Sequence, residues 1–204
     1  MSPFVMIHKI IFRPFDFFED IQSPGMVRIK QAVALIICAY IARVISIYLL
    51  GFSFETREAY QISILQEAIW IFIPWFTWCV AHWAVAAILD GEGKFVEIVY
   101  GSAYALVPYI ILIIPVTLLT QFLALDEAGI VNLLTYGIYA WVIWLFLLKV
   151  KVLHNFDLPK TLFISLLSII AVLILWFVCI LLYGLANQFV NFLLDIVKEL
   201  RLRG

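Results

Sequence analysis

The chain has 204 residues, of which 66% are hydrophobic and 13% are charged, and its formal net charge is −1. A soluble domain is nearer half apolar and a quarter charged, and a chain of this length cannot enclose so much apolar surface in water. The composition therefore excludes an ordinary water-soluble domain, and the lack of a basic excess argues against a nucleic-acid partner.

Residues 1–30 form the first segment, which we expect to be cytoplasmic or interfacial. Pro3, Pro14 and three acidic residues interrupt it, so it lacks the apolar core of a secretory signal peptide. Residues 13–21 predict a short amphipathic helix with Pro14 in its first turn. The predicted apolar face holds Phe15, Phe18 and Ile21, and the predicted acidic face holds Asp16, Glu19 and Asp20.

Five stretches are long and apolar enough to cross a bilayer, which takes about 20 residues of helix. Backbone polar groups in lipid must be satisfied internally, so these stretches are predicted to be helices. The predicted fold is an all-α membrane protein with about five transmembrane helices and amphipathic interfacial helices at both ends. Residues 31–186 would form one bundle and residues 187–204 an amphipathic tail. The predicted spans are residues 31–51, 67–89, 98–123, 130–148 and 162–185.

Lys and Arg are unevenly divided between the two sides of this five-span arrangement. Short cytoplasmic loops carry the excess of these residues in membrane proteins. We therefore expect a cytoplasmic N-terminus and an outer C-terminus. On that assignment the inner side holds Lys9, Arg13, Arg28, Lys30, Lys94, Lys149, Lys151 and Lys160, and the outer side holds Arg57, Lys198, Arg201 and Arg203.

The third predicted span and the turn before it carry most of the unusual residues. Gly91 and Gly93 permit a tight turn after the second span. Pro108 removes a backbone donor, so the span should kink there, and Pro115 should break it again one heptad later. A bent helix of this kind either lines a cleft or hinge or merely shapes the bundle.

Arg43 lies well inside the first predicted span. A charge at this depth needs a partner or a route to water. We expect contact with Glu67 at the start of the second span. Snorkelling toward the outer face and a contact with a substrate or subunit are the alternatives.

Known site chemistry is not evident in the sequence. Cys38, Cys79 and Cys179 lie singly in apolar runs and are expected to be packing residues. Cys79 and His82 share a helix face, but two ligands are too few for a metal site. No metalloprotease, paired-aspartate or nucleophile-elbow motif occurs. We therefore predict a protein that is not an enzyme and has no cofactor or metal.

Three motifs in order resemble the Yip1 domain family in a bacterial form. Pro14-Phe15-Asp16-Phe17-Phe18-Glu19-Asp20-Ile21 is similar to the family's opening Pro-x-x-Phe-Phe-x-x-Ile element. Gly91-Glu92-Gly93-Lys94-Phe95 is similar to its Gly-Gly-x-Gly-Ser/Lys-Phe turn, with Asp90 in place of the usual first glycine. Tyr104-Ala105-Leu106-Val107-Pro108 is similar to its Tyr-Ala-x-x-Pro segment.

The resemblance implies five spans, a cytoplasmic N-terminus and no catalytic residues. Eukaryotic relatives bind Rab GTPases, and some bacterial relatives accompany ABC transporters. The leading hypothesis is a non-catalytic scaffold or accessory subunit of the bacterial cytoplasmic membrane, partnered with ABC transporter subunits or with copies of itself. The alternatives are a small oligomeric carrier or channel, and a membrane-shaping or trafficking-type protein.

Overall fold

The computed structural model describes residues 3–55 and 58–203, and the structured elements in these two ranges are all helices. Five helical stretches are long and apolar enough to cross a membrane, which confirms the predicted all-α fold and the number of spans. They are Ile29–Tyr48, Ile64–Ile88, Phe95–Leu119, Leu125–Leu153 and Leu158–Glu199.

Two short helices at the N-terminus are packed onto one end of the bundle. They are α1 (Pro3–Phe12) and α2 (Pro14–Asp20), and an ion pair between Lys9 and Asp20 joins α1 to the end of α2. The predicted apolar face of α2 is partly wrong, because Phe15 is exposed and Phe17 takes its place in the core. The side chains of this segment that are buried in the core are those of Met6, Ile10, Phe17, Phe18 and Ile21.

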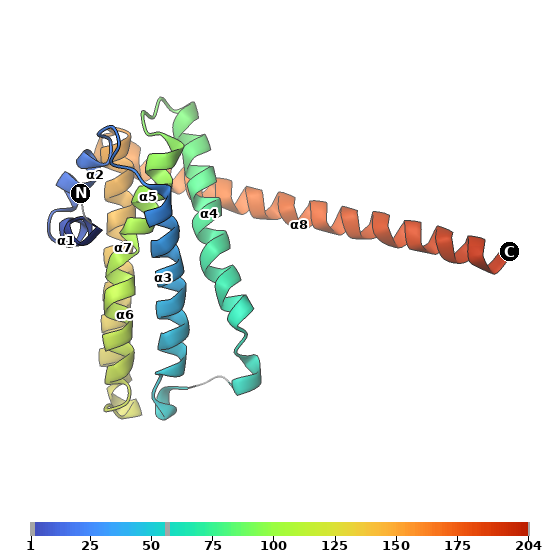
Figure 1. Ribbon diagram of the computed structural model, residues 1–204, viewed down its shortest axis with the longest axis horizontal. Helices are drawn as coiled ribbons and strands as arrows, with labels where there is room; N and C mark the ends of the chain where they lie inside the picture. Colours follow the sequence, from blue (N-terminus) through green and yellow to red (C-terminus); the bar gives the residue numbers. More distant parts are fainter. Residues whose placement is uncertain (1–2, 56–57, 204) are drawn as a thin grey trace.

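Four long helical columns stand side by side in Figure 1. They are α3 (Ile29–Tyr48), α4 (Ile64–Ile88), α5 (Phe95–Ala105) continued by α6 (Val107–Leu119), and α7 (Ala128–Leu153). Short 3-10 turns, η1 (Phe52–Phe54), η2 (Ala59–Gln61) and η3 (Leu125–Glu127), lie at the end of the bundle away from α1 and α2 (Figure 1). Ala39 and Ala42 of α3 pack with Tyr109 and Ile113 of α6, so small residues bring these helices close.

The third span is broken once, where the sequence predicted its first kink. The helix stops at Ala105 and resumes at Val107, so Pro108 is the second residue of α6, where its missing N–H costs no hydrogen bond. The second predicted break is wrong, because α6 runs through Pro115 without interruption. Pro115 lies on an exposed face of α6.

The last helix, α8 (Leu158–Arg203), has 46 residues and leaves the bundle sideways (Figure 1). Its first turns pack against α4, and the indole N–H of Trp176 donates to the Thr77 hydroxyl at 3.1 Å. From Phe177 to Glu199 every described side chain is exposed. The predicted tail of residues 187–204 is not a separate helix, because α8 continues unbroken to Arg203, and residue 204 lies outside the described ranges.

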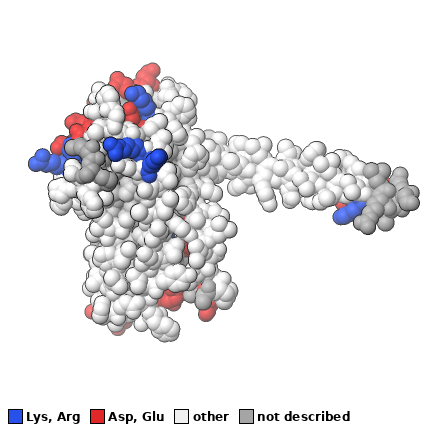
Figure 2. Space-filling model, in the orientation of Figure 1, with Lys and Arg blue, Asp and Glu red and all other residues white. Residues whose placement is uncertain are grey.

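The charges are divided between the two ends of the bundle. Figure 2 shows Lys and Arg gathered at the end that carries α1 and α2, with acidic side chains among them, and only acidic side chains at the opposite end. Glu55, Glu58, Asp126 and Glu127 belong to the connections at that opposite end. Arg57, which was expected there, lies outside the described residues.

The three cysteines do not share one environment. Cys79 is buried, as predicted, whereas Cys38 and Cys179 lie on exposed helix faces. The prediction that all three are packing residues is therefore wrong for two of them.

Candidate functional site

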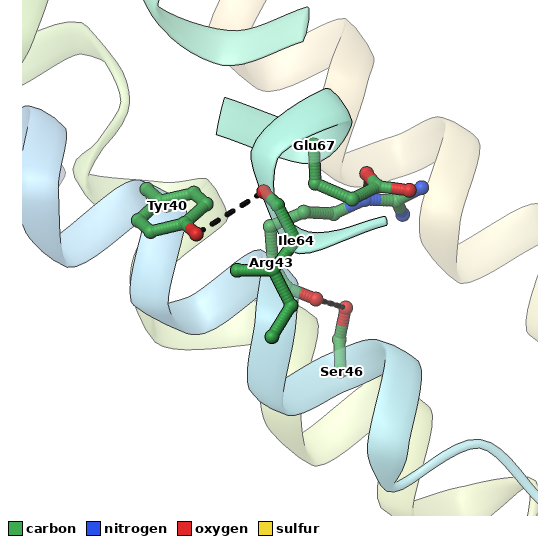
Figure 3. A network of polar contacts seen from close by, with 5 residues as sticks. All are labelled: Tyr40, Arg43, Ser46, Ile64 and Glu67. Atoms are coloured by element: carbon green, nitrogen blue, oxygen red, sulfur yellow. Dashed lines mark hydrogen bonds and ion pairs between the residues drawn. The ribbon is translucent and has the colours of Figure 1, made fainter. Parts of the chain in front are cut away.

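Arg43 and Glu67 form an ion pair between α3 and α4, as predicted. The Arg43 Nε donates to Glu67 Oε2 at 3.0 Å, and the Glu67 side chain is largely buried. Figure 3 shows both side chains between the two helices. Tyr40 strengthens the same junction by donating to the Ile64 carbonyl at 3.2 Å, and the Ser46 hydroxyl donates to the Arg43 carbonyl at 2.7 Å.

A cavity of about 890 Å³ begins at this pair and extends between α4 and α7. Helices α3 and α6 contribute one side of it, and the first turns of α8 contribute another. Its lining is dominated by aromatic side chains: Trp70, Trp75, Trp78, Tyr109, Tyr139 and Phe146. The pair and this cavity are the part of the bundle best suited to hold a small molecule.

The turn between α4 and α5 is built around the imidazole of His154, which directly follows α7. The backbone N–H of Gly93 donates to His154 Nδ1 at 3.1 Å. A Cβ at Gly91 would lie 2.5 Å from the same nitrogen, and a Cβ at Gly93 would lie 2.7 Å from His154 Cε1. Both predicted glycines are therefore required by one ring, a contact that the sequence did not indicate.

Asp90 takes a backbone conformation that glycine adopts most easily. The N–H of Gly91 returns to the Ala86 carbonyl at 2.8 Å, closing the C-terminus of α4 in the manner of a Schellman motif. Asp90 occupies the left-handed position of that motif with φ of 59°. Glycine adopts this conformation without steric cost, and aspartate tolerates it better than most residues.

His154 is held in its neutral form. Burial, together with the positive charge of nearby Lys149, lowers the pKa of His154 to about 4. Because Nδ1 accepts the hydrogen bond from Gly93, the neutral ring carries its proton on Nε2.

Tyr104 belongs to an aromatic group that joins α2, α3 and α5. Its ring lies 5.0 Å from that of Phe17 and 4.7 Å from that of Tyr100. Gln31 accepts hydrogen bonds from the Tyr100 hydroxyl at 2.9 Å and the Tyr104 hydroxyl at 3.4 Å. Two of the three sequence motifs, the α2 element and the Tyr104 segment, thus meet in one buried cluster.

A polar cluster around Lys149 was missed by sequence reasoning. Lys149 is fully buried, donates to the Ser102 hydroxyl at 2.7 Å and lies 5.0 Å from the centre of the Phe146 ring. The sequence suggested only a loop lysine, because Lys149 and Lys151 stand together at the end of an apolar run. Lys149 lies seven residues after Val142 and therefore on the same inward face of the span. This spacing is the sequence feature that could have predicted a buried lysine.

His82 lies beside this cluster. Its Nδ1 is 3.1 Å from the Ser168 hydroxyl, whose own proton goes to the Ile164 carbonyl at 2.8 Å, so the imidazole is the donor. The rings of His82 and His154 meet edge to face at 5.1 Å. Within the described residues, no three His, Cys, Asp or Glu side chains gather where a metal ion could bind.

The predicted site residues therefore fall into two groups and two outliers. Arg43 and Glu67 border the cavity, whereas Gly91, Gly93 and Tyr104 lie at the α1/α2 end.

 Pro108, at the break between α5 and α6, and Pro115, on an exposed face of α6, belong to neither group.

Comparison with known families supports the resemblance seen in the motifs. The family model described as Yip1 domain matches residues 9–180. The chain belongs to the Yip1 domain family. The match covers all three motifs, the four columns of the bundle and the first half of α8, so the Yip1 region ends where α8 has already left the bundle. No curated protein and no solved structure matches the chain.

Proposed function

We propose that this multi-pass membrane protein is a non-catalytic scaffold or accessory subunit that binds another integral membrane protein through α8. The observation that carries the proposal is the course of α8, which packs against α4 only as far as Trp176 and then leaves the bundle sideways (Figure 1). Transmembrane helices associate mainly through close van der Waals contact. Lipid chains are as apolar as the helix surfaces, so the hydrophobic effect does not draw the helices together. Beyond Trp176, the side chains of α8 that the structure describes, as far as Glu199, are exposed.

The length of α8 supports the same proposal. Its 46 residues correspond to about 69 Å of helix, roughly twice the hydrocarbon thickness of a bilayer. Only its first turns are needed to close the bundle, and residues 181–203 lie beyond the Yip1 match. The rest of the helix is available to a second membrane protein, for which the membrane subunits of an ABC-type transporter are the leading candidate.

The proposed location is the bacterial cytoplasmic membrane with the N-terminus inside. The gathering of Lys and Arg at the α1/α2 end and the acidic connections at the other end support this orientation (Figure 2). With five spans, the C-terminus would be outside.

Photo-crosslinking in native membranes tests the partner role. A benzophenone amino acid replaces Phe177 of α8 in one variant and Phe76 of α4 in the control, since both side chains are more than half exposed. We expect the Phe177 variant to crosslink to a transporter membrane subunit and the Phe76 variant to crosslink only to lipid. Crosslinks that join Phe177 only to a second copy of this chain would contradict the accessory role.

A small oligomeric carrier is the second candidate, favoured by the cavity and its Arg43–Glu67 pair. Solute flux into liposomes that contain only this protein distinguishes the two functions. An accessory subunit conducts nothing by itself, whereas a carrier does.

A further inference from the structure

The cavity beside Arg43 and Glu67 contains buried hydrogen-bond donors that the protein leaves unused. The indole Nε1 atoms of Trp75 and Trp78 and the hydroxyl of Ser165 are buried without a hydrogen-bond partner, and all three residues line the cavity. Ser165 as a whole is only 5% exposed. Because an indole nitrogen can only donate, the group that completes this site must supply acceptor oxygens.

The lining also specifies the shape of the ligand. Besides Trp75 and Trp78, aromatic rings of Trp70, Tyr139 and Phe146 face the space. Aromatic walls pack well against a flat ring, by stacking or by edge-to-face contact. The volume of about 890 Å³ is in the range that holds a compound of drug size.

The charges of the site favour a neutral ligand. Arg43 and Glu67 are both cavity residues, and each is matched by the other at 3.0 Å. A free anionic group would be drawn to Arg43 but repelled by Glu67 at the same place. Lys149 is not one of the cavity-lining residues, and its amino group lies over the rings of Trp78 and Phe146.

The depth of Trp75 and Trp78 in the bilayer indicates which kind of membrane molecule can reach them. Trp75 and Trp78 are about 17 Å and 21 Å along α4 from its start at Ile64, near the middle of this 25-residue span. The ester carbonyls of phospholipids stay at the border of the hydrocarbon layer, which is about 30 Å thick. Ile143 and Ile169, which line the cavity, are exposed on the outside of the helices, so the cavity opens toward the hydrocarbon.

We propose that this cavity binds a neutral, membrane-soluble ring compound with carbonyl oxygens, of the isoprenoid quinone class. The ring lies between the aromatic walls, and its carbonyl oxygens accept hydrogen bonds from Trp75, Trp78 and Ser165. The isoprenoid chain leaves through the opening beside Ile143 and Ile169. This inference does not rest on the proposed partner role of α8.

Quinone retention by the purified full-length chain tests the proposal. The protein in mild detergent is mixed with decylubiquinone and passed through gel filtration, and the bound quinone is extracted and quantified. The test variant Trp75→Phe/Trp78→Phe/Ser165→Ala removes the donors and keeps the aromatic walls. The control Trp141→Phe/Trp144→Phe changes two tryptophans of α7 that do not line this cavity. Ser165→Leu, which replaces the Ser165 hydroxyl by a bulkier apolar side chain at the cavity wall, is a second test variant should the triple variant fail to fold.

We expect about one quinone per chain for the unaltered protein and the control, and at least about tenfold weaker binding for the donor-free variant. Ser165→Leu should bind no quinone. Equal retention by all variants would show partition into detergent and would overturn the proposal. So would a stoichiometric phospholipid in the extract in place of quinone, or no retention by the folded unaltered chain. Crosslinking through Phe177 should be the same in every variant, so failure here is distinguishable from failure of the accessory role.

Discussion

Arg43 of α3 and Glu67 of α4 hold the first two spans together through a contact of 3.0 Å within the membrane-spanning part of the bundle (Figure 3). Glu67 is 8% exposed, so its charge depends on the neighbouring guanidinium. The pair therefore fixes how α4 stands against α3 at the mouth of the cavity.

Replacing Arg43 by Leu removes the cation that faces Glu67. We expect a loss of about 1–2 kcal/mol in the free energy of unfolding, less than for a fully buried pair because the Arg43 side chain is 34% exposed. Thermal unfolding in detergent measures the change. The double variant Arg43→Leu/Glu67→Leu should recover most of it, and a double variant as unstable as the single one would show that the pair is not the cause.

Replacing Gly93 by Ala places a Cβ 2.7 Å from His154 Cε1, which is closer than real contacts allow. We expect destabilisation by about 1–3 kcal/mol, since the ring or the turn must shift. Adding His154→Ala should relieve the clash and restore part of the loss. Gly137→Ala in α7 is the matched control, because a Cβ there meets nothing within 4 Å, and it should be neutral or stabilising by about 0.5–1 kcal/mol.

Acidification should destabilise the α4–α5 turn through His154. Its folded pKa of about 4 lies below its ordinary value of 6.5, so between these values the unfolded chain binds the proton more readily. Stability is fully present above about pH 6.5 and falls as the pH drops toward 4. Thermal unfolding at pH 7.5 and pH 5 checks this, and His154→Asn should reduce the difference. An unchanged difference in that variant would assign it to other groups.

Lys149 and Ser102 should respond in opposite directions. Lys149→Met keeps the length of the side chain and removes a fully buried amino group, so we expect stability to be unchanged or raised by about 1 kcal/mol. Ser102→Ala takes away the hydroxyl that accepts from Lys149 at 2.7 Å, and should cost about 1–2 kcal/mol. Unfolding temperatures of the two variants, measured side by side, show whether the buried amino group destabilises the fold. An equal loss of stability in both variants would contradict this prediction.

Features that depend on a short stretch of sequence, such as an apolar run, a proline or a charge within a span, could be predicted. Hydropathy located the first four spans to within five residues but ended the fifth far too early. Pro108 marked the break in the third span, and the depth of Arg43 required a partner such as Glu67. A break at Pro115 was wrongly predicted, because the helix on both sides of this exposed proline tolerates the loss of one hydrogen bond and stays continuous.

Contacts between distant residues escaped prediction. Gly93 meets His154 across 61 positions and Lys149 meets Ser102 across 47. Such pairs depend on how the helices turn toward one another, which an apolar run does not encode when nearly every position is hydrophobic. The sideways course of α8 is of the same kind, since residues 162–185 are almost entirely apolar on every face.

The side of the membrane on which each end lies tests the account most directly. Single cysteines replace Lys94, Glu127 and Lys198 in a chain whose native cysteines have been changed to alanine, and a membrane-impermeant maleimide is applied to intact cells. We predict labelling at positions 127 and 198 and protection at position 94 until the cells are opened. Labelling of position 94 in intact cells, or protection of position 198 while position 127 reacts, would contradict the orientation or the five-span arrangement.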